Sequence, residues 1–144
     1  MLGVISLCSA FLPGLRARNS GHLVITGSIA GHVAYAGGSC YNASKFAMTG
    51  FSQATRHDLK GTAIRVTQVS PGAVETEFSN VRFNGNDAKV DSVYAGFTPL
   101  NGEDIADNIM YAVTRPVHHQ VADMVVFANA QSGPTDIARN SAAP

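Results

Sequence analysis

Apolar and polar positions along the chain follow two periods, which predict three helices and three strands. Residues 2–18 are almost entirely apolar, and apolar residues recur every three to four positions across 41–60 and 101–114, which predicts helices over these ranges. Short β-branched runs bounded by glycine or proline predict buried strands at 22–26, 64–69 and 124–127. Pro13 lies inside the first helix, where we expect a kink or an early end.

The order of these elements predicts the fold class. Helix and strand alternate along the chain, and such alternation implies an α/β fold in which helices cover a parallel sheet. The carboxyl ends of parallel strands share one edge, where the active sites of such sheets lie. Ser28 follows the first strand and Pro71-Gly72 follows the second, so we expect them at the same edge of one domain that spans 1–144.

Two stretches lack a clear period. Residues 77–100 mix asparagine, glycine, aspartate and aromatic residues, and a long stretch with little regular structure is typical of a functional lid or a disordered segment. The tail from 128 to 144 is small and polar, so we expect it to be peripheral or frayed.

One constellation near the first strand carries candidate chemistry. Ser28 precedes Tyr41 by 13 residues, and Lys45 follows Tyr41 by four, which places the latter two side chains on one face of a helix. A free phenol titrates near pH 10, and a neighbouring ammonium favours the phenolate. Tyr41 could then exchange a proton with a carbonyl oxygen or alcohol that Ser28 holds in place. None of these groups stores electrons, so a nicotinamide cofactor is the natural hydride donor.

A Tyr-x-x-x-Lys spacing alone is weak, because a surface pair produces the same pattern. Here it coincides with a serine at a strand end, a helix that carries the pair, and Pro-Gly at the end of the next strand. The combination is specific.

Composition limits the partners and the compartment. Charged residues make up only 14% of the 144 positions, the net charge is +0, and no basic cluster is present, which argues against nucleic acid or an acidic membrane surface as a partner. The apolar run 1–15 has no preceding positive charge and is too short to span a bilayer, so we interpret it as a buried helix. Cys8 and Cys40 fit free thiols in a reducing cytoplasm, and the sequence leaves a single disulfide between them as the alternative. No Cys/His grouping has the spacing of a metal site.

The sequence resembles the short-chain dehydrogenase/reductase family over essentially its whole length. The matching pieces read GHLVITGSIAG, YNASK and RVTQVSPGAVET. Within the family, TEFSNVRF resembles the NADP-dependent 3-hydroxy acid dehydrogenases, which act on serine, allo-threonine and related acids. The resemblance implies a Rossmann-like sheet and reversible hydride transfer, with NADP as cofactor, at a secondary alcohol or ketone of a small 3-hydroxy acid. It leaves NAD open.

The resemblance also implies roles for individual residues. Ser28 matches the serine that orients the substrate, Tyr41 the acid/base, and Lys45 the residue that binds the nicotinamide ribose and lowers the tyrosine pKa. Four further positions match the nicotinamide site: the turn Pro71-Gly72, Val74, whose backbone would hold the carboxamide, and Thr76, whose hydroxyl would meet the phosphate region unless it only caps a helix. Residues 77–100 resemble the lid, where Arg82 is either a carboxylate anchor or a solvated arginine.

The chain departs from the family in its first half. It contains no glycine-rich turn for the cofactor's pyrophosphate and no Asn-Asn-Ala-Gly motif. We therefore expect a partial domain, the catalytic half without the N-terminal dinucleotide-binding half, that binds NADP weakly or not at all by itself. The first strand would then be an unpaired edge.

Two alternatives stay open. An inactive fragment could serve only as a dimerisation or interaction module, because the helices at 2–18 and 42–60 resemble those that the family uses to form homo-oligomers. A redox-inactive epimerase shares the Tyr-Lys pair but fits the short chain after the last strand less well.

Overall fold

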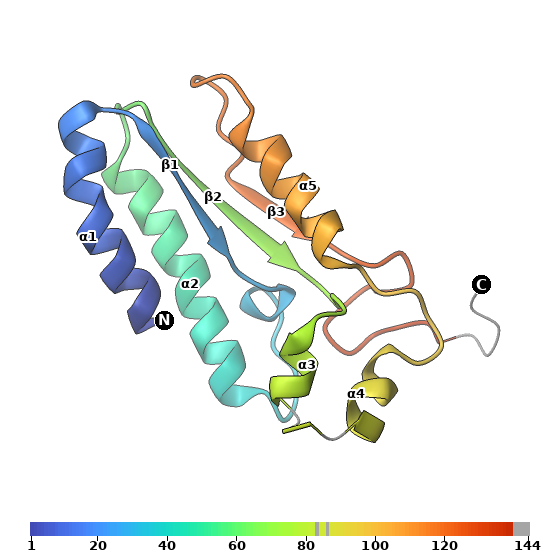
Figure 1. Ribbon diagram of the computed structural model, residues 1–144. Coiled ribbons are helices and arrows are strands. Elements are labelled where there is room, and N and C mark those ends of the chain that lie inside the picture. The colour runs from blue at the N-terminus through green and yellow to red at the C-terminus, as the bar shows by residue number, and fades with distance from the viewer. Residues whose placement is uncertain (83, 86, 140–144) are drawn as a thin grey trace.

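The computed structural model describes residues 1–82, 84–85 and 87–139 and arranges them as a parallel sheet with helices on both faces (Figure 1). The fold is therefore α/β, as predicted. In chain order the elements are α1 (Leu2–Arg18), β1 (Gly21–Thr26), the short 3₁₀ helix η1 (Ile29–Gly31), α2 (Ser39–Asp58), β2 (Ile64–Pro71), α3 (Glu77–Arg82), α4 (Asp87–Tyr94), α5 (Gly102–Val113) and β3 (Asp123–Val126).

The sheet has the order β1-β2-β3, and both pairings are parallel. Gly21 lies opposite Ile64, and Gln68 lies opposite Asp123. Every residue of β2 except Arg65 is buried, because β2 is flanked by a strand on each side and covered on both faces. β1 lies at an edge and is mostly half-buried, which agrees with the predicted unpaired edge.

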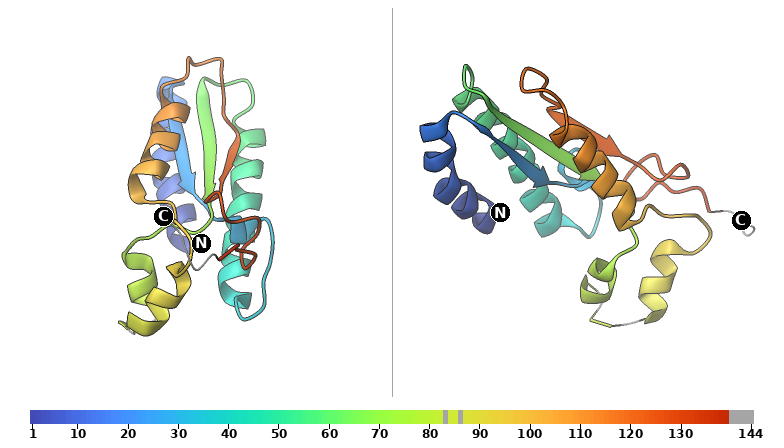
Figure 2. Two further views of the ribbon diagram at one scale, coloured as in Figure 1. Left: turned by 90° about the vertical axis from the view of Figure 1, so that its right-hand side faces the viewer. Right: turned by 45° about the horizontal axis from the view of Figure 1, so that its top comes forward.

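Two helical layers enclose the sheet. α1 and α2 cover one face and α5 covers the other (Figure 1 and Figure 2). The core under α1 and α2 is formed by buried apolar side chains from both helices and from the first two strands: Leu15, Ile25, Met48, Leu59, Ile64 and Val66. Burying side chains of this size contributes about 1.5–3 kcal/mol each, so this layer fixes where α2 lies against the sheet.

The opposite face is held by a half-buried cation. Arg65 of β2 donates hydrogen bonds to carbonyl oxygens in and just after the last turn of α5, at 3.1 Å to Val113 and 2.9 Å to Arg115. A guanidinium at a helix C-terminus satisfies carbonyls that have no partner within the helix and complements the helix dipole. At the other end, Asn101 and Asp104 form a capping box.

Three predictions need correction. The helix predicted over 2–18 is confirmed, but the early end considered at Pro13 is wrong: α1 continues to Arg18, because Leu15 beyond the proline is buried in the core and Asn19 closes the helix in the left-handed conformation. The 77–100 segment is not without regular structure, since it forms α3 and α4. The tail is not peripheral as far as residue 139, because residues between 131 and 139 line a cavity, while residues 140–144 lie outside the described part of the chain.

No helix in the described part of the chain is both long enough and apolar enough to cross a membrane.

Candidate active site

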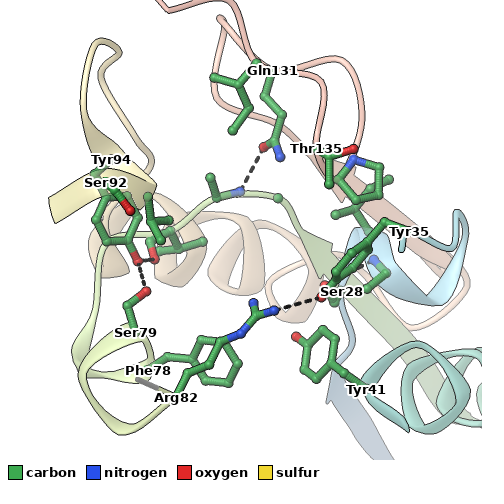
Figure 3. A pocket seen from close by; sticks show the side chains of 18 of the residues that line it. Ser28, Tyr35, Tyr41, Phe78, Ser79, Arg82, Ser92, Tyr94, Gln131 and Thr135 are labelled. Carbon is green, nitrogen blue, oxygen red and sulfur yellow. Dashed lines mark hydrogen bonds between the residues drawn. The ribbon is translucent and has the colours of Figure 1, made fainter. Parts of the chain in front are cut away.

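A cavity of about 400 Å³ opens at the carboxyl ends of the strands (Figure 3). Four stretches line it: the loop after β1 with the start of α2, the turn after β2, the 77–100 segment, and the tail from 131 to 139. This position is the one at which α/β sheets place their ligand sites. Its polar or ionisable lining residues include Ser28, Tyr35, Tyr41, Ser79, Arg82, Ser92, Tyr94, Gln131, Thr135 and Arg139.

Ser28 stands at the end of β1 and begins η1. Its hydroxyl oxygen accepts a hydrogen bond from the Ala30 backbone N–H at 3.2 Å, as an N-cap does, and its proton points to the Pro71 carbonyl at 3.5 Å. The side chain is buried yet reaches the cavity. The long contact to Pro71 is weak, so the hydroxyl can turn to a ligand at little cost.

A polar network behind Ser28 fixes η1 to the sheet. His32, the residue that ends η1, lies 2.9 Å from the Ser70 hydroxyl and 3.6 Å from an Asp123 carboxylate oxygen. Gln68 also donates to Ser70 at 2.9 Å. These contacts join η1 to β2 and β3, so the serine is positioned by the most buried part of the sheet.

Tyr41 and Lys45 lie one turn apart at the start of α2. The Lys45 ammonium is 5.6 Å from the centre of the Tyr41 ring, and it donates to the backbone carbonyls of Gly27 at 3.0 Å and Thr26 at 3.4 Å. Burial lowers the pKa of Lys45, because it removes water from the charged amine. Gly31 of η1 lets the backbones of η1 and α2 come close together, since a Cβ at this position would meet the Lys45 carbonyl oxygen at 2.6 Å.

The turn after β2 is held on three sides. The Ala73 N–H donates to the Gln131 side chain at 2.8 Å, and the Leu100 N–H donates to the Ala73 carbonyl at 3.0 Å. The Val74 carbonyl accepts from the Tyr94 hydroxyl at 2.9 Å. The segment that the resemblance assigns to the nicotinamide is therefore fixed in place by residues far along the chain.

The 77–100 segment faces Tyr41 across the cavity. The Phe78 ring lies 5.9 Å from the Tyr41 ring, and the Arg82 guanidinium lies 6.0 Å from the same ring. Arg82 also donates to the Tyr35 hydroxyl at 3.4 Å. Figure 3 shows the Tyr41 hydroxyl, the Arg82 guanidinium and the Tyr35 hydroxyl pointing into the same part of the cavity.

Comparison with known proteins identifies this architecture. The profile described as short chain dehydrogenase matches residues 1–87. The chain belongs to the short-chain dehydrogenase family. It is 42% identical over 142 residues to the NADP-dependent 3-hydroxy acid dehydrogenase of Schizosaccharomyces pombe, covering 99% of this chain and 55% of that protein. It is 41% identical over 131 residues to an Escherichia coli protein of the same description, covering 90% and 53%.

Solved structures of family members agree with these relatives. The closed form of a serine dehydrogenase complexed with NADP⁺ superposes with a TM-score of 0.88 at 41% identity, over 90% of this chain and 53% of that one. A serine dehydrogenase from Escherichia coli superposes with a TM-score of 0.73 at 33% identity. The chain thus spans about half the length of the curated relatives that it matches.

The structure brings most of the residues assigned from the family resemblance to one place. Five of them line the cavity: Ser28, Tyr41, Gly72, Val74 and Arg82. Lys45 and Pro71 do not line it; they contact the backbone of the β1 loop and the hydroxyl of Ser28, respectively. Thr76 does not line it either, and its hydroxyl accepts from the Phe78 N–H at 3.3 Å, which is the helix-capping alternative.

Several cavity residues were not predicted from the sequence, among them Tyr35, Tyr94, Gln131 and Arg139. Arg139 donates to the carbonyls of Ser92 and Val93, at 3.2 and 3.0 Å, and so anchors α4. A tyrosine inside the glycine-rich loop before α2 was a usable signal for Tyr35. The tail residues Gln131 and Arg139 carried no such sequence signal, because their place in the cavity depends on contacts with residues more than 40 positions away.

Proposed function

We propose that this chain carries the proton-transfer part of an NADP-dependent oxidoreductase that interconverts a secondary alcohol and a ketone on a small 3-hydroxy acid. One observation supports it above the others: Ser28, Tyr41 and Arg82 meet in a single cavity at the carboxyl ends of the strands. The names of the relatives, NADP-dependent 3-hydroxy acid dehydrogenases, favour the same reaction.

Tyr41 is the proton-transfer group in this proposal. Its hydroxyl takes the proton of the substrate alcohol during oxidation and returns it to the carbonyl oxygen during reduction. Ser28 donates to the same oxygen after turning from its long contact with the Pro71 carbonyl. The Lys45 ammonium behind the Tyr41 ring stabilises the phenolate, and the carbonyls of Thr26 and Gly27 hold that ammonium in place.

The nicotinamide end of the cofactor fits beside these groups. An ammonium and a phenol hydroxyl lie within one turn of α2, and the loop after β2 lies beside them, which together offer donors and acceptors suited to a ribose and a carboxamide. We assign Tyr41, Lys45, Pro71, Gly72 and Val74 to that end and Thr76 to the neighbouring phosphate. When bound, NADP supplies or accepts the hydride.

A replacement of Tyr41 tests the proposal. The variant is made in this chain together with any further residues that belong to the same protein. Tyr41→Phe keeps the ring against Phe78 but removes the transferred proton, so NADP-dependent turnover of a 3-hydroxy acid should fall at least about a hundredfold, the scale of one general acid/base. NADP affinity, measured by isothermal titration, should change little. Turnover at the wild-type rate would refute the assignment of Tyr41. A higher affinity for NAD than for NADP would show that NAD is the cofactor.

The exposed Tyr111 provides the matched control. Its ring stacks on the Arg115 guanidinium at 4.4 Å, outside the cavity, so Tyr111→Phe removes a hydroxyl of the same kind without touching the site. This variant should retain wild-type turnover.

The exposed apolar surface of α1 favours a second function, in which the chain serves as an interaction module that associates with a partner or with a copy of itself. Leu2, Leu7 and Phe11 on this helix are 80%, 61% and 63% exposed, and apolar surface gathered on one helix marks an association face. Light scattering distinguishes the two functions. A stable dimer with no NADP-dependent change in absorbance favours the module, whereas turnover favours the enzyme.

A further inference from the structure

Tyr35 and Arg82 form a polar end of the cavity that faces the proposed acid/base. Arg82 comes from the last turn of α3, and Tyr35 comes from the loop before α2, so the two side chains meet from opposite walls. The guanidinium donates to the Tyr35 hydroxyl at 3.4 Å and lies 6.0 Å from the Tyr41 ring (Figure 3).

The tyrosine hydroxyl retains a proton to donate. It accepts from Arg82, and among residues 1–82, 84–85 and 87–139 it donates to no acceptor. A hydroxyl that accepts from a cation is polarised and becomes a stronger donor. An anion placed between the two side chains would therefore receive an N–H and an O–H, which are both charge-assisted hydrogen bonds.

The rest of the cavity favours an anion at this end. No aspartate or glutamate is found among its lining residues in the described part of the chain. The second cation of the described lining, Arg139, donates to the carbonyl oxygens of Ser92 and Val93. Arg82 stands beside Tyr41, with its guanidinium 6.0 Å from the ring.

The protein holds the Tyr35 ring in a fixed position. The buried Asn42, next to Tyr41 on α2, donates to the Tyr35 carbonyl at 3.0 Å. The ring packs on Gly38, where a Cβ would come within 2.6 Å of it. A tyrosine fixed through both its backbone and its ring is preorganised for binding, because little rotamer entropy remains to be lost.

We propose that Tyr35 is a specificity-determining residue: its hydroxyl and the Arg82 guanidinium together receive the substrate carboxylate, so the cavity selects hydroxy acids over uncharged alcohols. This inference rests on the proposed function, in which the hydroxyl carbon of the same molecule faces Tyr41. It assigns the carboxylate to two residues from opposite walls instead of to Arg82 alone.

Binding of two matched ligands tests it without hydride transfer. The probes are 3-hydroxybutyrate and the uncharged 3-hydroxybutyramide, titrated into the chain and followed by NMR. Tyr35→Phe should weaken binding of the acid about tenfold to 150-fold, the range for one hydrogen bond to a charged group, and should change amide binding far less. Arg82→Gln should weaken acid binding further, and Arg82→Lys should fall between. Tyr111→Phe should bind both probes like the wild type.

Several outcomes would overturn the inference. Acid binding by Tyr35→Phe at wild-type strength, an equal loss for acid and amide, or failure of the wild type to prefer the acid would each do so. The proposed function fails separately: if Tyr41→Phe keeps full turnover while Tyr35→Phe loses the acid preference, the carboxylate site stands and the assignment of the acid/base falls.

Discussion

The two walls of the cavity are built in different ways. The α2 wall carries Ser28, Tyr41 and Lys45 on elements packed against the buried sheet, and it is fixed by the core and by the network around Gln68. The 77–100 wall consists of two short helices. It is attached by side-chain hydrogen bonds from Tyr94 to Val74 and from Arg139 to α4, and by backbone hydrogen bonds at Leu100.

This difference separates two tasks. Proton transfer needs groups held within a fraction of an ångström of a productive geometry, which a packed wall provides. Selecting and admitting a substrate requires a wall that can move, and elements with few buried apolar contacts open at lower free energy than a core does. In the proposed function, proton transfer would take place on the α2 wall and substrate selection on the 77–100 wall, with Tyr35 and Arg82 meeting where the two walls face each other.

The largest effect should come from a substitution that breaks the fixed wall. In Gly31→Ala the new Cβ would lie 2.6 Å from the Lys45 carbonyl oxygen and 2.8 Å from the Thr49 hydroxyl, and the backbone of α2 cannot yield without moving Tyr41. We expect a loss of about 1–3 kcal/mol of stability, the usual cost of overpacking, as measured by urea unfolding.

Gly50→Ala is the control for this substitution. Gly50 lies within α2, but a Cβ there would meet nothing within 4 Å. Alanine in a helix is more stable than glycine by about 0.5–1 kcal/mol, so this variant should gain stability. If Gly31→Ala were also neutral or stabilising, the α2 wall would not be fixed as described.

A more local effect should follow from loosening the 77–100 wall. Tyr94→Phe removes hydrogen bonds to the Val74 carbonyl at 2.9 Å and to the Ser79 hydroxyl at 2.7 Å, each with a net value of about 0.5–1.5 kcal/mol. Amides in 77–100 should exchange hydrogen faster while those of α2 stay protected. Unchanged exchange in 77–100 would show that this wall does not depend on Tyr94. Tyr111→Phe should alter neither.

The same contrast explains what could be predicted from the sequence. The α2 wall follows from local signals: β-branched strands, a helical period, and a serine, a tyrosine and a lysine at fixed spacing. The other wall does not, because Gln131 reaches Ala73 over 58 positions and Arg139 reaches Ser92 over 47. No local pattern encodes such pairs, so a small polar tail was mistaken for a peripheral one.

The smallest effect should be a pH dependence that belongs to the fixed wall alone. Burial lowers the pKa of Lys45 in the folded chain, so the unfolded chain binds that proton more tightly and stability should rise with pH between the lowered pKa and the ordinary lysine value near 10.4. Lys45→Met should lose this rise, as urea unfolding at pH 8 and pH 10.5 would measure. The exposed Lys60, replaced in the same way, should retain it. If stability changed equally with pH in wild type and Lys45→Met, burial of the Lys45 ammonium would not destabilise the folded chain. The two walls would then differ less in electrostatics than in packing.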